Sequence, residues 1–114
     1  MSDFMLVMTG GHEIWNKMSA EEKQRIMEKY YAFVGRLRRE NRFKSGSALK
    51  QGGLELRSEK GIVVVDGPFS ETKEALNGYF VFEAANQEEA VAIARDCPAL
   101  THGETVQIFE LSNH

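Results

Sequence analysis

The chain has 114 residues, a formal net charge of −3, 42% hydrophobic residues and a single cysteine. A chain of this length fits one domain, and at this size about two-thirds of the unfolded chain's surface can be buried. One cysteine excludes an internal disulfide, and the sequence shows no signal peptide and no long apolar run. We therefore expect one cytoplasmic domain, residues 1–114, that makes no contact with a membrane.

The first part of the chain predicts a strand, a connection and a long helix. Residues 4–8 are apolar at both alternating sets of positions, which is typical of a strand covered on both faces. Gly10-Gly11 ends this strand, and residues 12–18 form a connection. Ser19 and Glu22 have the spacing of a capping box at a helix start. The apolar stripe that follows consists of Ile26, Met27, Tyr30, Phe33, Val34 and Leu37.

A basic stretch follows the apolar stripe, from residue 36 to residue 50. Arg38, Arg39 and Arg42 fall at the C-terminal end of the helix, where they complement its dipole. Such a run can also contact phosphate backbones. The chain is acidic overall and carries no recognisable nucleic-acid module, so a solvated helix end is the favoured interpretation and nucleic acid is not an expected partner.

The second half of the chain predicts further strands around a hairpin. Residues 45–53 are read as a short strand and a turn. Residues 54–57 alternate and residues 62–65 form a β-branched run, so the two predict a hairpin whose second strand is buried. The remaining elements are a strand over 78–84, a helix that begins at Asn86 and is closed by Pro98, and a strand over 105–111.

This order predicts a ferredoxin-like α+β sandwich, β-α-β-β-α-β, with an inserted β-hairpin. Two helices cover only one face of a four-stranded sheet, yet three of the strands are apolar on both faces. The second face therefore needs a cover. We expect a homodimer in which two sheets pack face to face.

The loop over residues 66–74 is where chemistry concentrates. Asp66 stands at a strand end, where a carboxylate can act as a general base or accept a hydrogen bond from a ligand. It can equally form a turn, because aspartate bonds backbone amides two residues on. Ser70 can cap a short helix in which Lys73 projects outward. Ser70 and Lys73 also have the spacing of serine acyl-transfer enzymes, whose other motifs are absent.

The connection over residues 12–18 supplies the other candidate groups. His12 can approach the central loop, or it can be a solvated loop residue. Trp15, Tyr30, Phe69 and Tyr79 can line an aromatic pocket, although aromatic residues at such spacing more often belong to a core. The three histidines show no metal-ligand spacing, so we expect no metal and no cofactor.

These residues resemble the YCII-related, or DGPF-domain, family over nearly the whole chain. The motifs that carry the resemblance are a strand and glycines followed by Trp15, the run Asp66-Gly67-Pro68-Phe69 with Glu71-Thr72-Lys73-Glu74 after it, Gly78-Tyr79, and Cys97-Pro98. The resemblance implies a bacterial, dimeric α+β barrel built from ferredoxin-like halves. Some relatives are attached to sigma factors of the extracytoplasmic type.

The resemblance also implies an acid–base pair of a histidine and an aspartate. The aspartate corresponds to Asp66, whereas the first helix offers Tyr30 or Tyr31 where relatives have the histidine. The candidate catalytic residues are thus Asp66, Tyr30 and His12, and the candidate ligand-binding residues are Trp15, Phe69, Glu71, Lys73 and Tyr79.

Three functions remain open from the sequence. The first is a dimer that binds a small polar or aromatic metabolite near Asp66, with cofactor-independent proton transfer of the lyase or isomerase kind. The second is a non-catalytic regulatory or interaction module, for example one that acts with an extracytoplasmic-type sigma factor. The third is a loop that only locks the dimer.

Overall fold

The computed structural model describes residues 1–67 and 76–112. Its main sheet has four strands in the order β2-β5-β1-β6, and every neighbouring pair is antiparallel. This arrangement confirms an α+β class and is compatible with a ferredoxin-like fold. The strands are β1 (Ser2–Thr9), β2 (Phe43–Ala48), β5 (Leu76–Ala84) and β6 (Thr105–Glu110).

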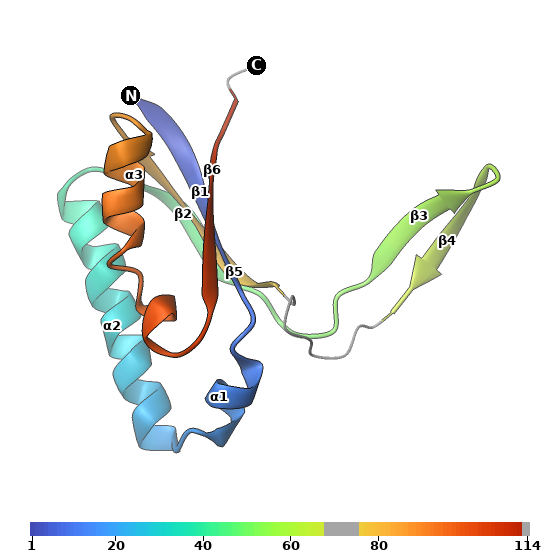
Figure 1. Cartoon of the computed structure of the whole chain (residues 1–114), viewed down its shortest axis with the longest axis horizontal. Helices are drawn as coiled ribbons and strands as arrows, with labels where there is room; N and C mark the ends of the chain where they lie inside the picture. Colours follow the sequence, from blue (N-terminus) through green and yellow to red (C-terminus); the bar gives the residue numbers. More distant parts are fainter. Residues whose placement is uncertain (68–75, 113–114) are drawn as a thin grey trace.

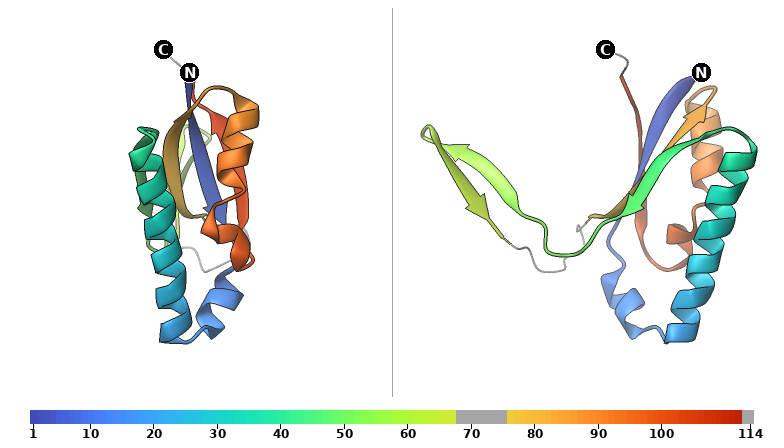
Figure 2. Two further views of the ribbon diagram at one scale, coloured as in Figure 1. Left: turned by 90° about the vertical axis from the view of Figure 1, so that its left-hand side faces the viewer. Right: turned by 180° about the vertical axis from the view of Figure 1, so that it is seen from behind.

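The two longer helices pack on one face of this sheet, and the short first helix lies beyond the end of the sheet (Figures 1 and 2). They are α1 (His12–Lys17), α2 (Ala20–Arg39) and α3 (Gln87–Ala94), with a 3-10 turn η1 at Pro98–Thr101. None of the helices in the described part of the chain is both long and apolar enough to span a membrane. The core between helices and sheet centres on Phe4, Leu6, Leu37 and Phe82, all at most 2% exposed.

The long helix begins where the capping box predicts. The Glu22 backbone N–H donates to Ser19 Oγ at 3.1 Å, and the Ser19 N–H donates to Glu22 Oε1 at 3.3 Å. Ile26, Phe33 and Leu37 of the predicted stripe are buried, whereas Met27 is 38% exposed. The capping box therefore predicted the start of α2, and the 3–4 spacing predicted its packed face.

Two arginines of the basic stretch, at and just after the end of α2, connect α2 with α3. Arg36 pairs with Glu40 at 3.1 Å and with Asp96, beyond α3, at 2.7 Å. Arg42 pairs with Glu40 and with Glu89 of α3. These two arginines are satisfied within the chain, which agrees with the helix-end interpretation rather than a phosphate site.

Residues 12–17 form the helix α1, where the sequence predicted a connection. Gly11 precedes it in the left-handed conformation, and the Trp15 N–H donates to the Gly11 carbonyl at 3.0 Å. A helix of six residues offers too short a pattern for periodicity to detect. Its effect is to place His12 and Trp15 on one rigid turn.

The predicted hairpin exists as a separate two-stranded sheet of β3 (Glu55–Glu59) and β4 (Ile62–Asp66), which we call the arm. Figure 1 shows the arm leaving the body of the protein. The prediction that residues 62–65 form a buried strand is wrong, because Ile62, Val63 and Val65 are 56–68% exposed. An apolar run shows that a strand is suited to burial, but it does not show which chain would bury it.

The sheet surface opposite the helices is apolar at its centre. Cross-strand pairs place Met5 beside Val81 and Phe109, and Val7 beside Tyr79. We call these five residues the open face. Phe109 is 52% exposed, and no described helix covers this side. The prediction of strands that are apolar on both faces is thus confirmed.

Candidate functional site

A cleft of about 590 Å³ lies at the end of the sheet where β1 runs into α1. Its walls come from α1, α2, the end of β2 and the turn that leads into β6. Apolar and aromatic side chains make up much of the lining. Tyr30, Asn77 and His102 meet at Glu104, whereas Arg38 lies eight residues beyond Tyr30 on α2. The lining includes Met8, His12, Trp15, Tyr30, Arg38, Phe43, Asn77, Phe80, His102 and Glu104.

A histidine–carboxylate pair occupies the inner wall of this cleft. Nε2 of His102 contacts Oε2 of Glu104, and the two side chains are only 4% and 7% exposed. In a neutral imidazole the proton then lies on Nε2, because that nitrogen faces the carboxylate, and Nδ1 carries the lone pair. This is the arrangement of a histidine base that is oriented by an acid.

Gly11 allows Glu104 to approach the end of β1. A Cβ atom at Gly11 would lie 2.7 Å from Cγ of Glu104, and the Gly11 φ of +75° is one that residues with a Cβ rarely adopt. Any larger residue would push the carboxylate away from its partners. The glycine pair that the sequence analysis read only as a strand end therefore also makes room for the site.

Asn77 supplies a second donor to Glu104. The register between β1 and β5 shifts at Met8 and Thr9, so Asn77 is an extra residue, a β-bulge. Its Nδ2 donates to the Gly10 carbonyl at 2.6 Å and to Oε1 of Glu104. The bulge turns the side chain of a strand residue toward the cleft.

Tyr30 supplies the third donor. Its hydroxyl donates to Oε2 of Glu104 at 3.2 Å and contacts the sulfur of Met8 at 3.7 Å. Burial, followed by the nearby Glu104 carboxylate, raises the pKa of Tyr30 well above its usual range. Tyr30 therefore keeps its proton at neutral pH and acts here as a hydrogen-bond donor, not as the base.

Three buried polar atoms of the cleft residues lack a hydrogen-bond partner among the described residues: His12 Nε2, Asn77 Oδ1 and His102 Nδ1. Buried polar groups are nearly always paired, and an unpaired one costs about 1–3 kcal/mol. Three such atoms in one cleft indicate a place where a ligand or water supplies the missing partners.

Aromatic rings surround His102. The Trp15 ring lies 6.0 Å from it and the Tyr30 ring 6.3 Å, centre to centre. Lys23 in turn lies 5.4 Å from the centre of the Trp15 ring. The His102 imidazole thus lies in a partly aromatic environment, which suits a planar or apolar ligand.

The predicted site residues separate into three groups. His12, Trp15 and Tyr30 lie together in the cleft, as the aromatic-pocket hypothesis requires. Asp66 lies at the end of β4 on the arm, paired with Arg57 and 47% exposed, and Tyr79 lies on the open face. Neither belongs to the described lining of the cleft. Phe69, Glu71 and Lys73 lie outside the described residues, as do Ser70 and His114.

His102, Glu104 and Asn77 were missed as site residues. His102 was considered only as a metal ligand, and Glu104 and Asn77 were not considered. A signal was present: two titratable residues flank Gly103 just before the last strand, so the turn presents both at the sheet end. Sequence alone gave no reason to place this turn beside Tyr30, because 72 residues separate Tyr30 from His102.

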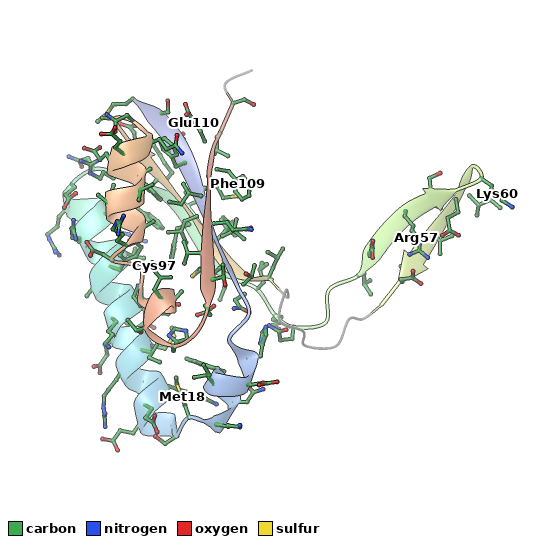
Figure 3. All side chains as sticks on the ribbon, viewed as in Figure 1. Met18, Arg57, Lys60, Cys97, Phe109 and Glu110 are labelled. Carbon is green, nitrogen blue, oxygen red and sulfur yellow. The ribbon has the colours of Figure 1, made fainter. Side chains whose placement is uncertain are left out.

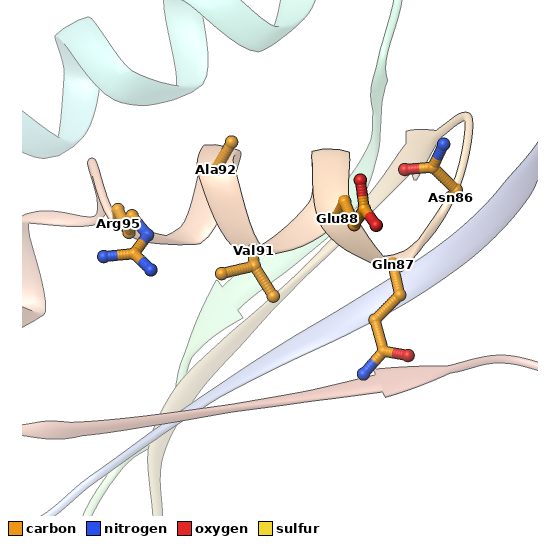
Figure 4. A pocket seen from close by; sticks show the side chains of 6 residues that line it. All are labelled: Asn86, Gln87, Glu88, Val91, Ala92 and Arg95. Carbon is orange, nitrogen blue, oxygen red and sulfur yellow. The ribbon is translucent and has the colours of Figure 1, made fainter.

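Two other features are weaker candidates for a functional site. Burial raises the pKa of the Cys97 thiol to about 11, so it stays protonated and is a poor nucleophile at neutral pH. A second hollow on the outer side of α3 is lined by one helix and its cap (Figure 4). Its residues are exposed, and it has no buried polar group.

Comparison with known proteins places the chain in a family. Residues 5–112 match the model of the YCII-related domain. The chain is also similar to an uncharacterized protein of Rhizobium meliloti (strain 1021), with 35% identity over 89 residues. The match covers 72% of this chain and 66% of that relative, so the chain spans just under two-thirds of the relative's length.

The chain belongs to the YCII-related family. The resemblance based on the Asp66-Gly67-Pro68-Phe69 motif is thereby confirmed.

Proposed function

We propose that the cleft binds a small aromatic carboxylic acid and that His102 exchanges a proton with it, in a cofactor-independent reaction of the lyase or isomerase kind. The observation that carries this proposal is the buried His102–Glu104 pair, on whose carboxylate Tyr30 and Asn77 also converge. Three donors fix Glu104, and Glu104 fixes the imidazole. Nδ1 of His102 is then the atom that takes or gives the proton.

The carboxylate in the ligand is inferred from Arg38. This residue lines the cleft from α2, and its guanidinium lies 4.9 Å from the centre of the Phe43 ring. Stacking on an aromatic ring holds a guanidinium in place without using its hydrogen-bond donors. A carboxylate bound there would leave the rest of the ligand along the apolar wall of the cleft, which includes Val34 and Phe80.

Thermal-shift screening with benzoate, phenylacetate and phenylpyruvate tests ligand binding. Each acid is compared with its amide, which lacks the charge. We expect the acids to raise the melting temperature of the wild type more than the amides do. Arg38→Gln should abolish the difference, whereas Arg39→Gln, next to it on α2 but outside the cleft lining, should preserve it. No stabilisation by any acid would contradict the binding proposal.

Proton transfer is tested with the variant His102→Gln. Glutamine keeps an N–H that can donate to Glu104 but has no basic nitrogen, so binding should persist. The measurement is exchange of the side-chain CH₂ protons of phenylpyruvate with deuterated solvent, followed by NMR. We expect the wild type and Asp66→Asn to speed the exchange and His102→Gln to lose most of this effect. Equal exchange by wild type and His102→Gln would show that His102 is not the base.

We further propose that the protein is a homodimer, with the two sheets joined as an α+β barrel. The apolar open face supports this, since a patch of that kind on a lone chain favours association. Sedimentation of the wild type at micromolar concentration tests it directly, and a monomer there would defeat it. The cleft gives no support to the alternative that the protein is a regulatory module acting with a sigma factor.

A further inference from the structure

The arm has two chemically different sides. Directly opposed residues of a hairpin share a face, so the pairs Leu56–Val65 and Ser58–Val63 define one side. Arg57, Glu59 and Asp66 lie on the other side, where Arg57 pairs with both acids. The first side is thus uncharged and mostly apolar, whereas on the other side Ile62 and Val64 lie among the charged residues.

The apolar side has no cover in a single chain. Leu56, Val63 and Val65 are 63%, 64% and 56% exposed. The radius of gyration is 16.1 Å, whereas about 13 Å is usual for a compact chain of this length. Figures 1 and 2 show why: the arm projects from the body on the side of the sheet away from the helices. An isolated two-stranded hairpin is only marginally stable in water.

The two chain segments at the base of the arm lie very close together. A Cβ at Gly67 would lie 2.9 Å from the Gly53 carbonyl and 2.9 Å from a methyl group of Leu54, and its φ is +126°. The two chain segments that leave the body therefore touch at Gly67. The glycine of the family motif thus allows these two segments to approach closely at the base of the arm.

We infer that the arm packs its apolar side onto the open face of a second copy of this chain. This inference rests on the proposed homodimer and assigns the arm a place in it. The two surfaces match in chemistry, because Leu56, Val63 and Val65 and the five residues of the open face are all uncharged. The charged residues on the same side of the sheet, Asp3 and Glu83, oppose each other beyond Met5 and Val81. Figure 3 shows Phe109 on β6, and Arg57 and Lys60 on the arm.

A second copy is the partner that supplies both surfaces at once. A charged peptide would gain nothing from either surface. In a two-fold dimer each chain gives its arm and receives the other, so both apolar surfaces of both chains are covered by one contact. The ionic side of the arm, around Arg57, would then face solvent.

Sedimentation equilibrium on the full chain tests the inference. Val63→Thr combined with Val65→Thr keeps the β-branched shape but adds hydroxyl groups, and it should weaken the dimer at least about tenfold. The matched control is Ile62→Thr, which changes a residue that is more exposed, at 68%, but lies on the ionic side. This control should leave the dissociation constant within about twofold.

Phe109→Thr on the open face distinguishes the inference from the dimer on which it rests. We expect Phe109→Thr and the Val63/Val65 variant to weaken the dimer alike. If Phe109→Thr weakens it while the Val63/Val65 variant does not, the sheets pair without the arms and the inference fails. If Ile62→Thr and the Val63/Val65 variant weaken it equally, the apolar side of the arm is not the contact, and the inference fails as well.

Discussion

Two carboxylates of this chain show how differently the cleft and the arm are built. The Glu104 side chain is 7% exposed and is contacted by Tyr30 of α2, Asn77 of β5 and His102 of its own turn. Asp66 is 47% exposed and pairs with Arg57 of the neighbouring strand. The buried acid is held by the whole fold, whereas the exposed acid is held only by its own hairpin. The family motif that begins at Asp66 therefore contains the acid with the weaker structural role, whereas Glu104 lies outside the motif.

We expect the largest effect from Glu104→Ala, which removes the buried carboxylate. Removing the carboxylate takes a shared acceptor from three buried groups: Asn77 keeps only the Gly10 carbonyl, Tyr30 keeps only the Met8 sulfur, and His102 Nε2 loses its partner. This should lower the free energy of unfolding by about 3 kcal/mol. Urea denaturation followed by circular dichroism measures it. Glu110→Ala, an exposed position of β6, the strand that follows Glu104, is the control and should change stability by less than about 0.5 kcal/mol. Equal effects would mean that the cleft is not a fixed network.

A smaller and local effect should follow from Gly67→Ala at the base of the arm. The new methyl group would contact Gly53 and Leu54 at under 3 Å, and the residue would keep a strained φ, at a cost of about 1–3 kcal/mol. Hydrogen exchange should speed up at amides of β3 and β4 but not in the main sheet. Gly53→Ala is the control, since nothing lies within 4 Å of its Cβ position. Faster exchange in the main sheet would show that arm and body unfold together.

The smallest effect should come from Asp66→Asn. The Asp66–Arg57 pair is largely exposed, and such pairs contribute little because solvent screens them. We expect no measurable change in the unfolding midpoint in urea. Arg57→Gln, which removes the other partner, should behave in the same way. A clear loss of stability in Asp66→Asn alone would instead support the hypothesis that this loop locks the dimer.

Local sequence signals predicted most of the elements. The Ser19–Glu22 box fixed the start of α2, and the Asn86 side chain accepts the predicted bond from the Glu89 N–H at 2.9 Å. These features involve residues three apart, so their physics is contained in a short window. The hairpin over residues 55–66 was predictable for the same reason.

The site was predictable only in part. His12, Trp15 and Tyr30 were identified because they are polar or aromatic residues near the first helix. His102 and Glu104 approach them only because β6 pairs with β1, a contact across some hundred residues that no local pattern encodes. The exposure of residues 62–65 escaped prediction for a related reason, since the surface that would cover them is absent from the single chain.

The bulge at Asn77 has a consequence for anyone who redesigns this protein. A sheet optimised for regular pairing would drop the extra residue, and β1 and β5 would then form an uninterrupted ladder. That shorter chain would lose the amide that reaches both Gly10 and Glu104. A search for greater regularity would thus remove one support of the proposed chemistry, so the irregular residue should be kept fixed when the rest of the strand is redesigned.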